Sequence, residues 1–70
     1  MDVKGLVLAD LLKNRTVYEI FDEEFRRGTW LDASALVGSE SSIEDLYNDK
    51  TVPSGVLDAV VERLEKLDDL

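Results

Sequence analysis

The chain has 70 residues, a net charge of −8 and 44% hydrophobic residues. A chain of this length forms one small domain, so we predict a single domain over residues 1–70, with a core close to the minimum for independent folding. The chain has neither cysteine nor histidine, which excludes disulfides and the ligand pattern of a structural zinc site. Its stability must therefore come from helix packing, from a partner or from self-association.

The composition also bears on where the protein works. The apolar content is too high for a disordered chain, and no apolar run reaches the roughly 20 residues that cross a bilayer. The first five residues, Met1 to Gly5, lack the basic region and the small-residue cleavage site of a signal peptide. We therefore expect a cytoplasmic protein without a membrane partner.

Apolar residues recur with a helical period along almost the whole chain. This pattern predicts an all-α fold, namely a compact orthogonal bundle of about five short helices with short connections. The expected helices span roughly residues 3–13, 17–27, 30–37, 42–48 and 55–67.

Local signals predict where the first two helices begin and end. Gly5 weakens the start of the first helix, and Asn14 marks its stop. Thr16 and Glu19 have the spacing of a capping box for the second helix, and Gly28 is expected to close it in a left-handed conformation.

Similar signals border the later helices. Thr29 is the expected cap of the third helix and Gly38 its end. Ser41 and Glu44 have the spacing of a capping box for the fourth helix, and Ser54 is the expected cap of the fifth.

Each predicted helix has an inward face. In the second helix Ile20, Phe21 and Phe25 form the apolar stripe, with Asp22, Glu23 and Glu24 mostly on the opposite face. The residues expected to face inward in the three later helices are Trp30, Ala33, Leu36, Val37, Ile43, Leu46, Tyr47, Val56, Leu57, Val60, Val61, Leu64 and Leu67.

The stripe of the last helix is unusually wide because it contains two adjacent apolar pairs. A wide stripe on a terminal helix is typical of packing against a partner or a second copy, although a small bundle can also bury all of it internally. The candidate partner-binding residues on this helix are Val56, Leu57, Val60, Val61 and Leu64.

The acidity belongs to the second half of the chain. Residues 1–29 carry six acids and five bases, whereas residues 30–70 carry ten acids and three bases. Such a surface repels nucleic acid and anionic membranes, and it either suits a basic partner or keeps the protein soluble. Glu40, Glu44 and Asp45 are candidate partner-binding acids, and Trp30 is a candidate interface anchor whose alternative is a place in the core.

No set of residues indicates catalysis. The usual general base, histidine, and the thiol nucleophile are both missing. No serine lies in a nucleophile-elbow pattern, and the isolated glycines cannot form a phosphate loop. The acids also lack the spacing of a calcium loop. We expect a protein that is not an enzyme and that uses no cofactor or metal.

One segment has the spacing of a known motif. Ala33 supplies a small residue, a turn follows at Val37 and Gly38, and the branched residue Ile43 comes ten positions after the alanine. Leu46 takes the next apolar position. The following helix opens at Pro53 and has the packing face Leu57, Val60 and Leu64. With this spacing, residues 31–64 resemble the helix-turn-helix region of lambda-repressor-like (Cro-type) domains.

The resemblance implies a transcriptional regulator that binds DNA through the segment from Ser39 to Asp45. This segment departs from the family pattern because it carries three acids where DNA readers carry arginine, lysine, asparagine or glutamine. Nucleic acid is therefore not the expected partner.

The leading hypothesis is a non-catalytic protein–protein interaction or regulatory module. Its expected partner is another protein with a basic surface, and a homodimer through the C-terminal helix is a further possibility. The alternatives are a helix-turn-helix regulator that binds DNA and an acidic inhibitor that mimics nucleic acid.

Overall fold

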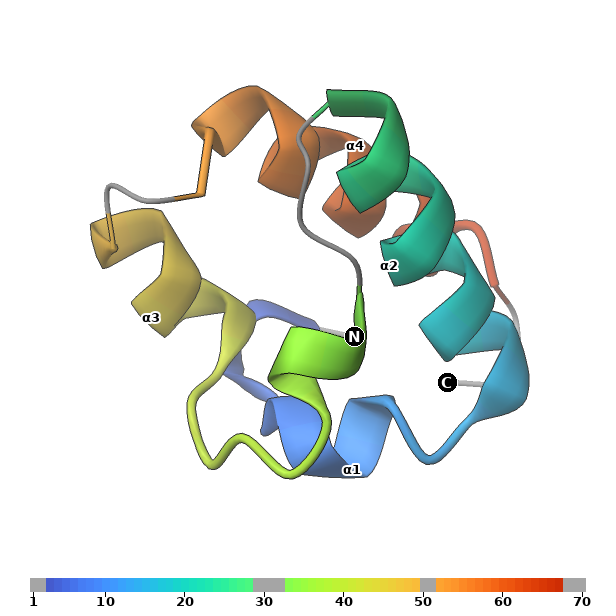
Figure 1. Cartoon of the computed structure of the whole chain (residues 1–70), viewed down its shortest axis with the longest axis vertical. Helices are drawn as coiled ribbons and strands as arrows, with labels where there is room; N and C mark the ends of the chain where they lie inside the picture. The colour runs from blue at the N-terminus through green and yellow to red at the C-terminus, as the bar shows by residue number, and fades with distance from the viewer. Residues whose placement is uncertain (1–2, 29–32, 50–51, 68–70) are drawn as a thin grey trace.

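The computed structural model describes residues 3–28, 33–49 and 52–67. These residues form an all-α fold, as predicted, with the short 3-10 helices η1 (Val3–Gly5) and η2 (Ala33–Leu36) and the α-helices α1 (Leu8–Leu11), α2 (Arg15–Gly28), α3 (Ile43–Asn48) and α4 (Ser54–Glu65) (Figure 1). Within the described ranges, the β structure consists of one isolated bridge between Val7 and Ser42. No helix in these ranges is long and apolar enough to cross a membrane.

The two longest helices, α2 and α4, pack against each other and form the frame of the bundle. They run antiparallel, because Thr16 near the start of α2 lies beside Leu67, and Gly28 at its end lies beside Val56. Phe21 and Phe25 are completely buried in α2, and their rings meet edge to face with centroids 5.7 Å apart. Edge-to-face contact is a preferred arrangement of aromatic rings, so this pair packs without strain.

The apolar stripe of α4 lies inside the bundle. Leu57, Val60 and Leu64 are fully buried, and Val56 and Val61 are nearly so. The predicted width of the stripe is thus real, but α4 packs against α2, α3 and η1 at once and buries it within the single chain. These five residues were candidates for partner binding, and the structure leaves them very little exposed apolar surface.

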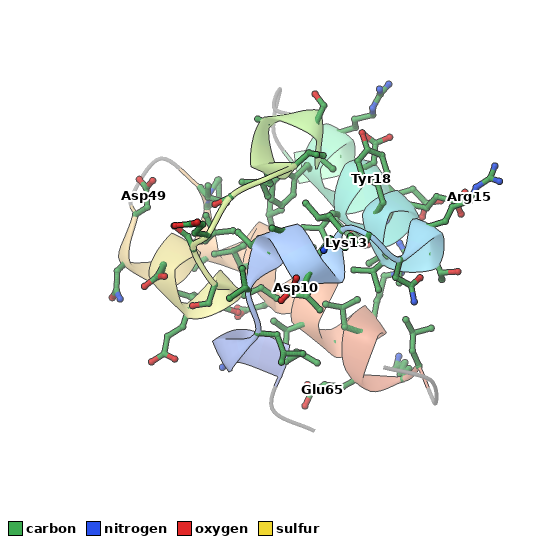
Figure 2. All side chains as sticks on the ribbon, turned by 90° about the horizontal axis from the view of Figure 1, so that it is seen from below. Asp10, Lys13, Arg15, Tyr18, Asp49 and Glu65 are labelled. Carbon is green, nitrogen blue, oxygen red and sulfur yellow. The ribbon has the colours of Figure 1, made fainter. Side chains whose placement is uncertain are left out.

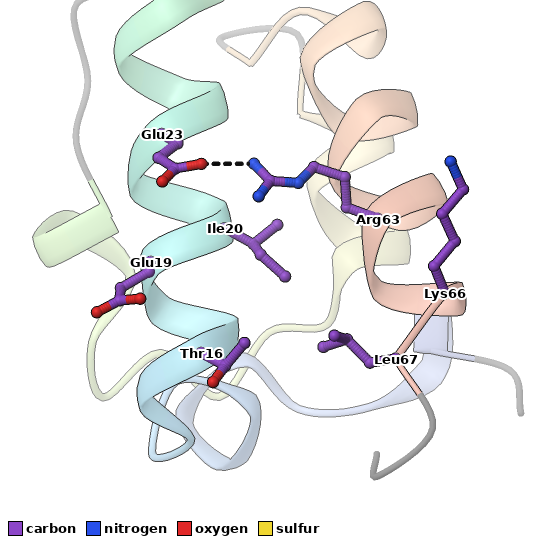
Figure 3. A pocket seen from close by; sticks show the side chains of 7 residues that line it. All are labelled: Thr16, Glu19, Ile20, Glu23, Arg63, Lys66 and Leu67. Atoms are coloured by element: carbon purple, nitrogen blue, oxygen red, sulfur yellow. Dashed lines mark hydrogen bonds and ion pairs between the residues drawn. The ribbon is translucent and has the colours of Figure 1, made fainter.

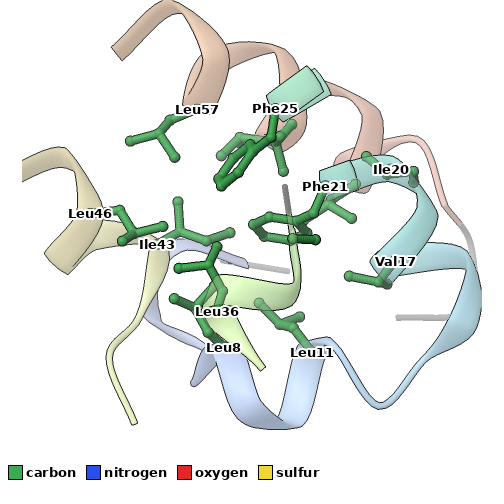
Figure 4. Packing of buried hydrophobic residues seen from close by; sticks show 14 of the residues in the cluster. Leu8, Leu11, Val17, Ile20, Phe21, Phe25, Leu36, Ile43, Leu46 and Leu57 are labelled. Atoms are coloured by element: carbon green, nitrogen blue, oxygen red, sulfur yellow. The ribbon is translucent and has the colours of Figure 1, made fainter. Parts of the chain in front are cut away.

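Short elements close the other side of the core. Leu8 and Leu11 of α1, Leu36 of η2 and Ile43 and Leu46 of α3 point toward the phenylalanine pair (Figure 4). The Cα radius of gyration is 10.6 Å, close to the roughly 11 Å expected for a folded domain of this length. The chain therefore closes a core without a second subunit.

The predicted helix over residues 3–13 is wrong as a continuous element. It is interrupted after Gly5, and Val7 adopts an extended backbone with φ −71° and ψ 132°. The N–H of Leu8 donates to the Ser41 carbonyl at 2.8 Å, and the N–H of Ala9 donates to the Ser39 carbonyl at 2.9 Å. The first N–H groups of a helix have no acceptor within that helix, and here the carbonyls of the segment before α3 accept them.

The predicted start of α2 is two residues late. The Asn14 side-chain oxygen accepts the N–H groups of Thr16 and Val17 at 2.9 and 3.3 Å, so Asn14 caps α2 rather than ending the preceding helix. Thr16 lies inside the helix, and Glu19 pairs with Arg15 instead of completing a capping box. Glu24, expected on the solvent side, is 7% exposed and belongs to the buried face.

The caps of α3 and α4 also differ by one residue from the prediction. The capping box of α3 consists of Ser42 and Asp45, not Ser41 and Glu44. Pro53 occupies the N-cap position of α4, and Ser54 is its first helical residue. The helix ends at Glu65, and Leu67 packs beyond it against the core.

Gly28 was expected to close α2 in a left-handed conformation, but among the described residues Gly38 is the glycine that adopts it. Gly38 has φ +82°, the left-handed conformation that glycine adopts most readily, and it turns the chain between η2 and α3. Gly28 lies within α2 without a positive φ, and a Cβ at this position would overlap the Val56 side chain. Gly28 thus permits the close approach of α2 and α4.

The helix predicted over residues 30–37 is described from Ala33 onward, where it is the single 3-10 turn η2. Ala33 and Leu36 are buried as expected, whereas Val37 is 60% exposed and does not face inward. The predicted cap Thr29 and the candidate anchor Trp30 lie outside the described residues.

The close approach at Gly28 predicts opposite effects for two glycine substitutions. Gly28→Ala forces its methyl group into Val56 and should lower the free energy of unfolding by about 1–3 kcal/mol, as overpacking does. Gly55→Ala, in open space on α4, should be neutral or stabilise by up to about 1 kcal/mol. Denaturant unfolding of both variants checks this, and equal effects would contradict the packing described for Gly28.

Candidate functional site

Five exposed carboxylates gather on and around α3, and we call this set the acidic face: Glu40, Glu44, Asp45, Asp49 and Asp58. The first four come from one segment, and the sequence has no lysine or arginine between Gly28 and Lys50. Asp49, at the end of α3, projects from the outer edge of the molecule (Figure 2). The face therefore combines high negative charge with full access to solvent.

The capping of α3 fixes the acidic face in place. The N–H of Asp45 donates to the Ser42 hydroxyl at 3.3 Å, and the N–H of Ser42 donates to the Asp45 carboxylate at 3.0 Å. Ile43 and Leu46 are buried on the opposite side of this short helix. Because the helix is held at its cap and along its apolar side, Glu44 is directed outward.

Tyr47 connects the acidic face to the rest of the bundle. Its hydroxyl donates a hydrogen bond to the Asp58 carboxylate of α4 at 2.6 Å, and the Lys4 ammonium of η1 lies 5.2 Å from its ring centroid. This distance is within the range of a cation–π contact. Three elements that are distant in sequence thus meet at one half-buried tyrosine.

Desolvation, followed by the hydrogen bond to Asp58 and its negative charge, raises the pKa of Tyr47 from 10.0 to about 12. Each cause disfavours the phenolate, because the phenolate is poorly solvated there and would face a carboxylate. The hydroxyl therefore remains a hydrogen-bond donor at neutral pH.

A second surface feature is a groove of about 360 Å³ between the start of α2 and the end of α4. Ile20 and Leu67 supply its apolar floor, Glu19 stands on the α2 side, and Lys66 stands on the α4 side (Figure 3). The groove is open rather than enclosed, so it offers a surface for a macromolecule and not a sealed pocket for a small substrate.

One arginine bridges the two helices at the groove. The Arg63 guanidinium lies 2.7 Å from a Glu23 carboxylate oxygen and 3.3 Å from one of Glu24 (Figure 3 draws the bond to Glu23). The bond to Glu23 raises the pKa of Arg63 above its ordinary value, so the guanidinium stays charged. Arg27 approaches the other Glu24 oxygen at 3.6 Å. The buried carboxylate of Glu24 is thus balanced by two cations.

The candidate residues from the sequence fall into three groups in the structure. Glu40, Glu44 and Asp45 lie exposed on the acidic face. The five apolar candidates of α4 lie in the core, and Trp30 lies outside the described residues. Two contacts could not be foreseen from the sequence, that of Tyr47 with Asp58 and that of Arg63 with Glu24, because each joins residues on different helices.

The exposed carboxylates of the acidic face can attract positively charged groups. Among the described residues, however, no three acidic side chains converge to hold a metal ion.

No family model matches the chain, and the searches of curated proteins and of solved structures find no match either.

The Tyr47 hydrogen bond predicts a pH dependence in alkali. The Tyr47 pKa is higher in the folded chain than in the unfolded chain, so its contribution to stability is complete below pH 10 and is lost as the pH rises toward 12. Relative to Tyr47→Phe, the wild type should therefore lose free energy of unfolding across this range. Urea unfolding at a series of alkaline pH values checks this, and parallel curves for the two proteins would show that the tyrosine is unperturbed.

Burial, not distance, should decide which glutamate matters to stability. Glu24→Gln leaves Arg63 and Arg27 near an uncharged buried group, and we expect it to cost about 1–3 kcal/mol of unfolding free energy. Glu23→Gln removes the shorter bond, but Glu23 is 56% exposed, so the expected cost is below about 1 kcal/mol. Thermal and denaturant unfolding of the two variants compares them. A larger loss for Glu23→Gln would contradict this ranking.

Proposed function

We propose that this protein is a non-catalytic interaction module that binds a basic partner protein through the acidic face. The observation that carries the proposal is the uneven balance of charge over the surface. The carboxylates of α1 and α2, such as Asp10 and Asp22, each pair with a lysine or arginine, whereas on α4 Glu62 is paired and Glu65 has no such partner among the described residues. On the acidic face, Glu40, Glu44 and Asp58 form no ion pair with any described residue.

Unbalanced charge of this kind favours binding more than it favours folding. Carboxylates without a counter-ion repel one another, and this repulsion adds nothing to the stability of the bundle. A cationic surface relieves the repulsion and is steered toward the face during diffusion. The same physics makes such binding sensitive to ionic strength, because exposed charges are screened.

A helix-turn-helix regulator is the second candidate. It is favoured by the left-handed turn at Gly38 between two buried positions, Ala33 and Ile43. However, the exposed residues of α3 include Glu44 and Asp45, which would face DNA phosphates with charge of the same sign. The electrostatics therefore favour a basic protein over DNA.

The proposal predicts that neutralising the acidic face weakens binding to a cationic probe. For the double variant Glu40→Gln/Glu44→Gln, affinity for an oligolysine peptide should fall about 2- to 30-fold, since each exposed charge contributes about 0.2–1 kcal/mol. The matched control Glu62→Gln/Glu65→Gln removes the same charge from the end of α4 and should change the affinity much less. Fluorescence anisotropy at low and at physiological salt measures both.

Two outcomes would overturn the proposal. Equal loss in the two double variants would show that net charge alone governs binding. Binding of mixed duplex DNA by the wild type at tens of micromolar protein would instead support the helix-turn-helix candidate, since non-specific DNA binders reach about this affinity.

A further inference from the structure

The groove between α2 and α4 has walls of opposite charge. Glu19 and Glu23 stand on the α2 side, and Arg63 and Lys66 stand on the α4 side, with the apolar floor between them (Figure 3). The rest of the described surface is dominated by acids, and within residues 33–49 and 52–67 these two cations are the only ones. In these two described ranges, positive charge is therefore found only at the groove.

We propose that this groove binds a second copy of the chain, in a two-fold dimer whose axis runs along the groove. A two-fold axis in this direction places the α2 wall of one copy opposite the α4 wall of the other. Glu19 then faces the partner's Lys66, and each charge pair occurs twice. The two apolar floors meet near the axis. A surface with opposite charges on its two sides is complementary to itself under this one symmetry operation.

Charge complementarity favours a second copy over an arbitrary partner. A chain with a net charge of −8 is repelled by its own copies at most approaches. At the groove the repulsion is offset, because Glu19 of each copy meets Lys66 of the other while Glu23 stays paired with Arg63 of its own chain. The acidic face lies on and around α3 and is not part of the groove, so this inference is independent of the proposed function.

The side chains at the groove can exchange partners at little cost. Glu19 pairs with Arg15 and Lys66 pairs with Glu62, each on its own helix, and Glu19 and Lys66 are 58% and 72% exposed. Exposed pairs of this kind contribute little to the stability of a single chain. The bond between Arg63 and Glu23 crosses between the helices and remains in place as one end of the groove.

The test is a charge swap between Glu19 and Lys66. Wild-type chain should self-associate in sedimentation velocity at protein concentrations up to about 1 mM, the range for small transient interfaces. Glu19→Lys alone and Lys66→Glu alone should each weaken self-association about tenfold or more, because each places like charges opposite one another twice. An equimolar mixture of the two variants should restore association as a heterodimer, since every facing pair is again of opposite sign.

Matched controls separate this geometry from net charge. Glu44→Lys and Lys13→Glu change the net charge by the same amounts at exposed positions outside the groove, and they should leave self-association nearly unchanged. Circular dichroism verifies that all four variants fold. A monomeric wild type at low salt, a mixture that fails to associate, or controls that act as strongly as the groove variants would each overturn the proposal.

Discussion

The packing of Phe21 and Phe25 between α2 and α4 is the contact on which the rest of this structure depends. A chain of 70 residues without cysteine has no cross-link to restrain it, so its stability must come from apolar burial. The two rings occupy the centre of the core, and the short elements assemble around them (Figure 4). Gly28 allows the helices to approach closely enough for α4 to cover the rings.

Few apolar side chains remain on the surface, because the core uses nearly all of them. Because α4 uses its wide stripe against three other elements, Val37 is the one large apolar side chain left well exposed in the described ranges. The described surface therefore offers the partner that we propose chiefly charge and a shallow groove. The charge is arranged in two different ways, unbalanced on the acidic face and paired across the groove.

The periodic features of the fold could be predicted from the sequence. The stripes of α2 and α4 follow a helical period over three turns or more, which makes their buried faces evident. The caps could not be assigned with the same certainty. Ser41 and Ser42 are adjacent, as are Glu44 and Asp45, so two capping boxes with identical spacing were possible. Similarly, Gly5 signalled a weak helix, but the pairing of Val7 with Ser42 depends on a segment more than thirty residues away.

The candidate site could also be predicted only in part from the sequence. The acids near α3 could be identified because they cluster in sequence. The bridge from Arg63 to Glu23 and the bond from Tyr47 to Asp58 could not, because residues 40 and 11 positions apart meet only after the helices pack. The burial of Glu24 escaped prediction for a similar reason. A glutamate is tolerated on a buried face when cations from the same helix and from its neighbour both reach it, and Arg27 and Arg63 do so here.

We infer that α2 and α4 form one cooperative apolar unit within a single chain. Native-state hydrogen exchange at low protein concentration tests this cooperativity, since it measures the opening free energy of each amide. The buried turns of α2 around Phe21 and of α4 around Val60 should share the highest protection, equal to the free energy of global unfolding. Amides of α4 that exchange through much cheaper local opening than those of α2 would contradict it, because α4 would then not be held by the monomer's own core.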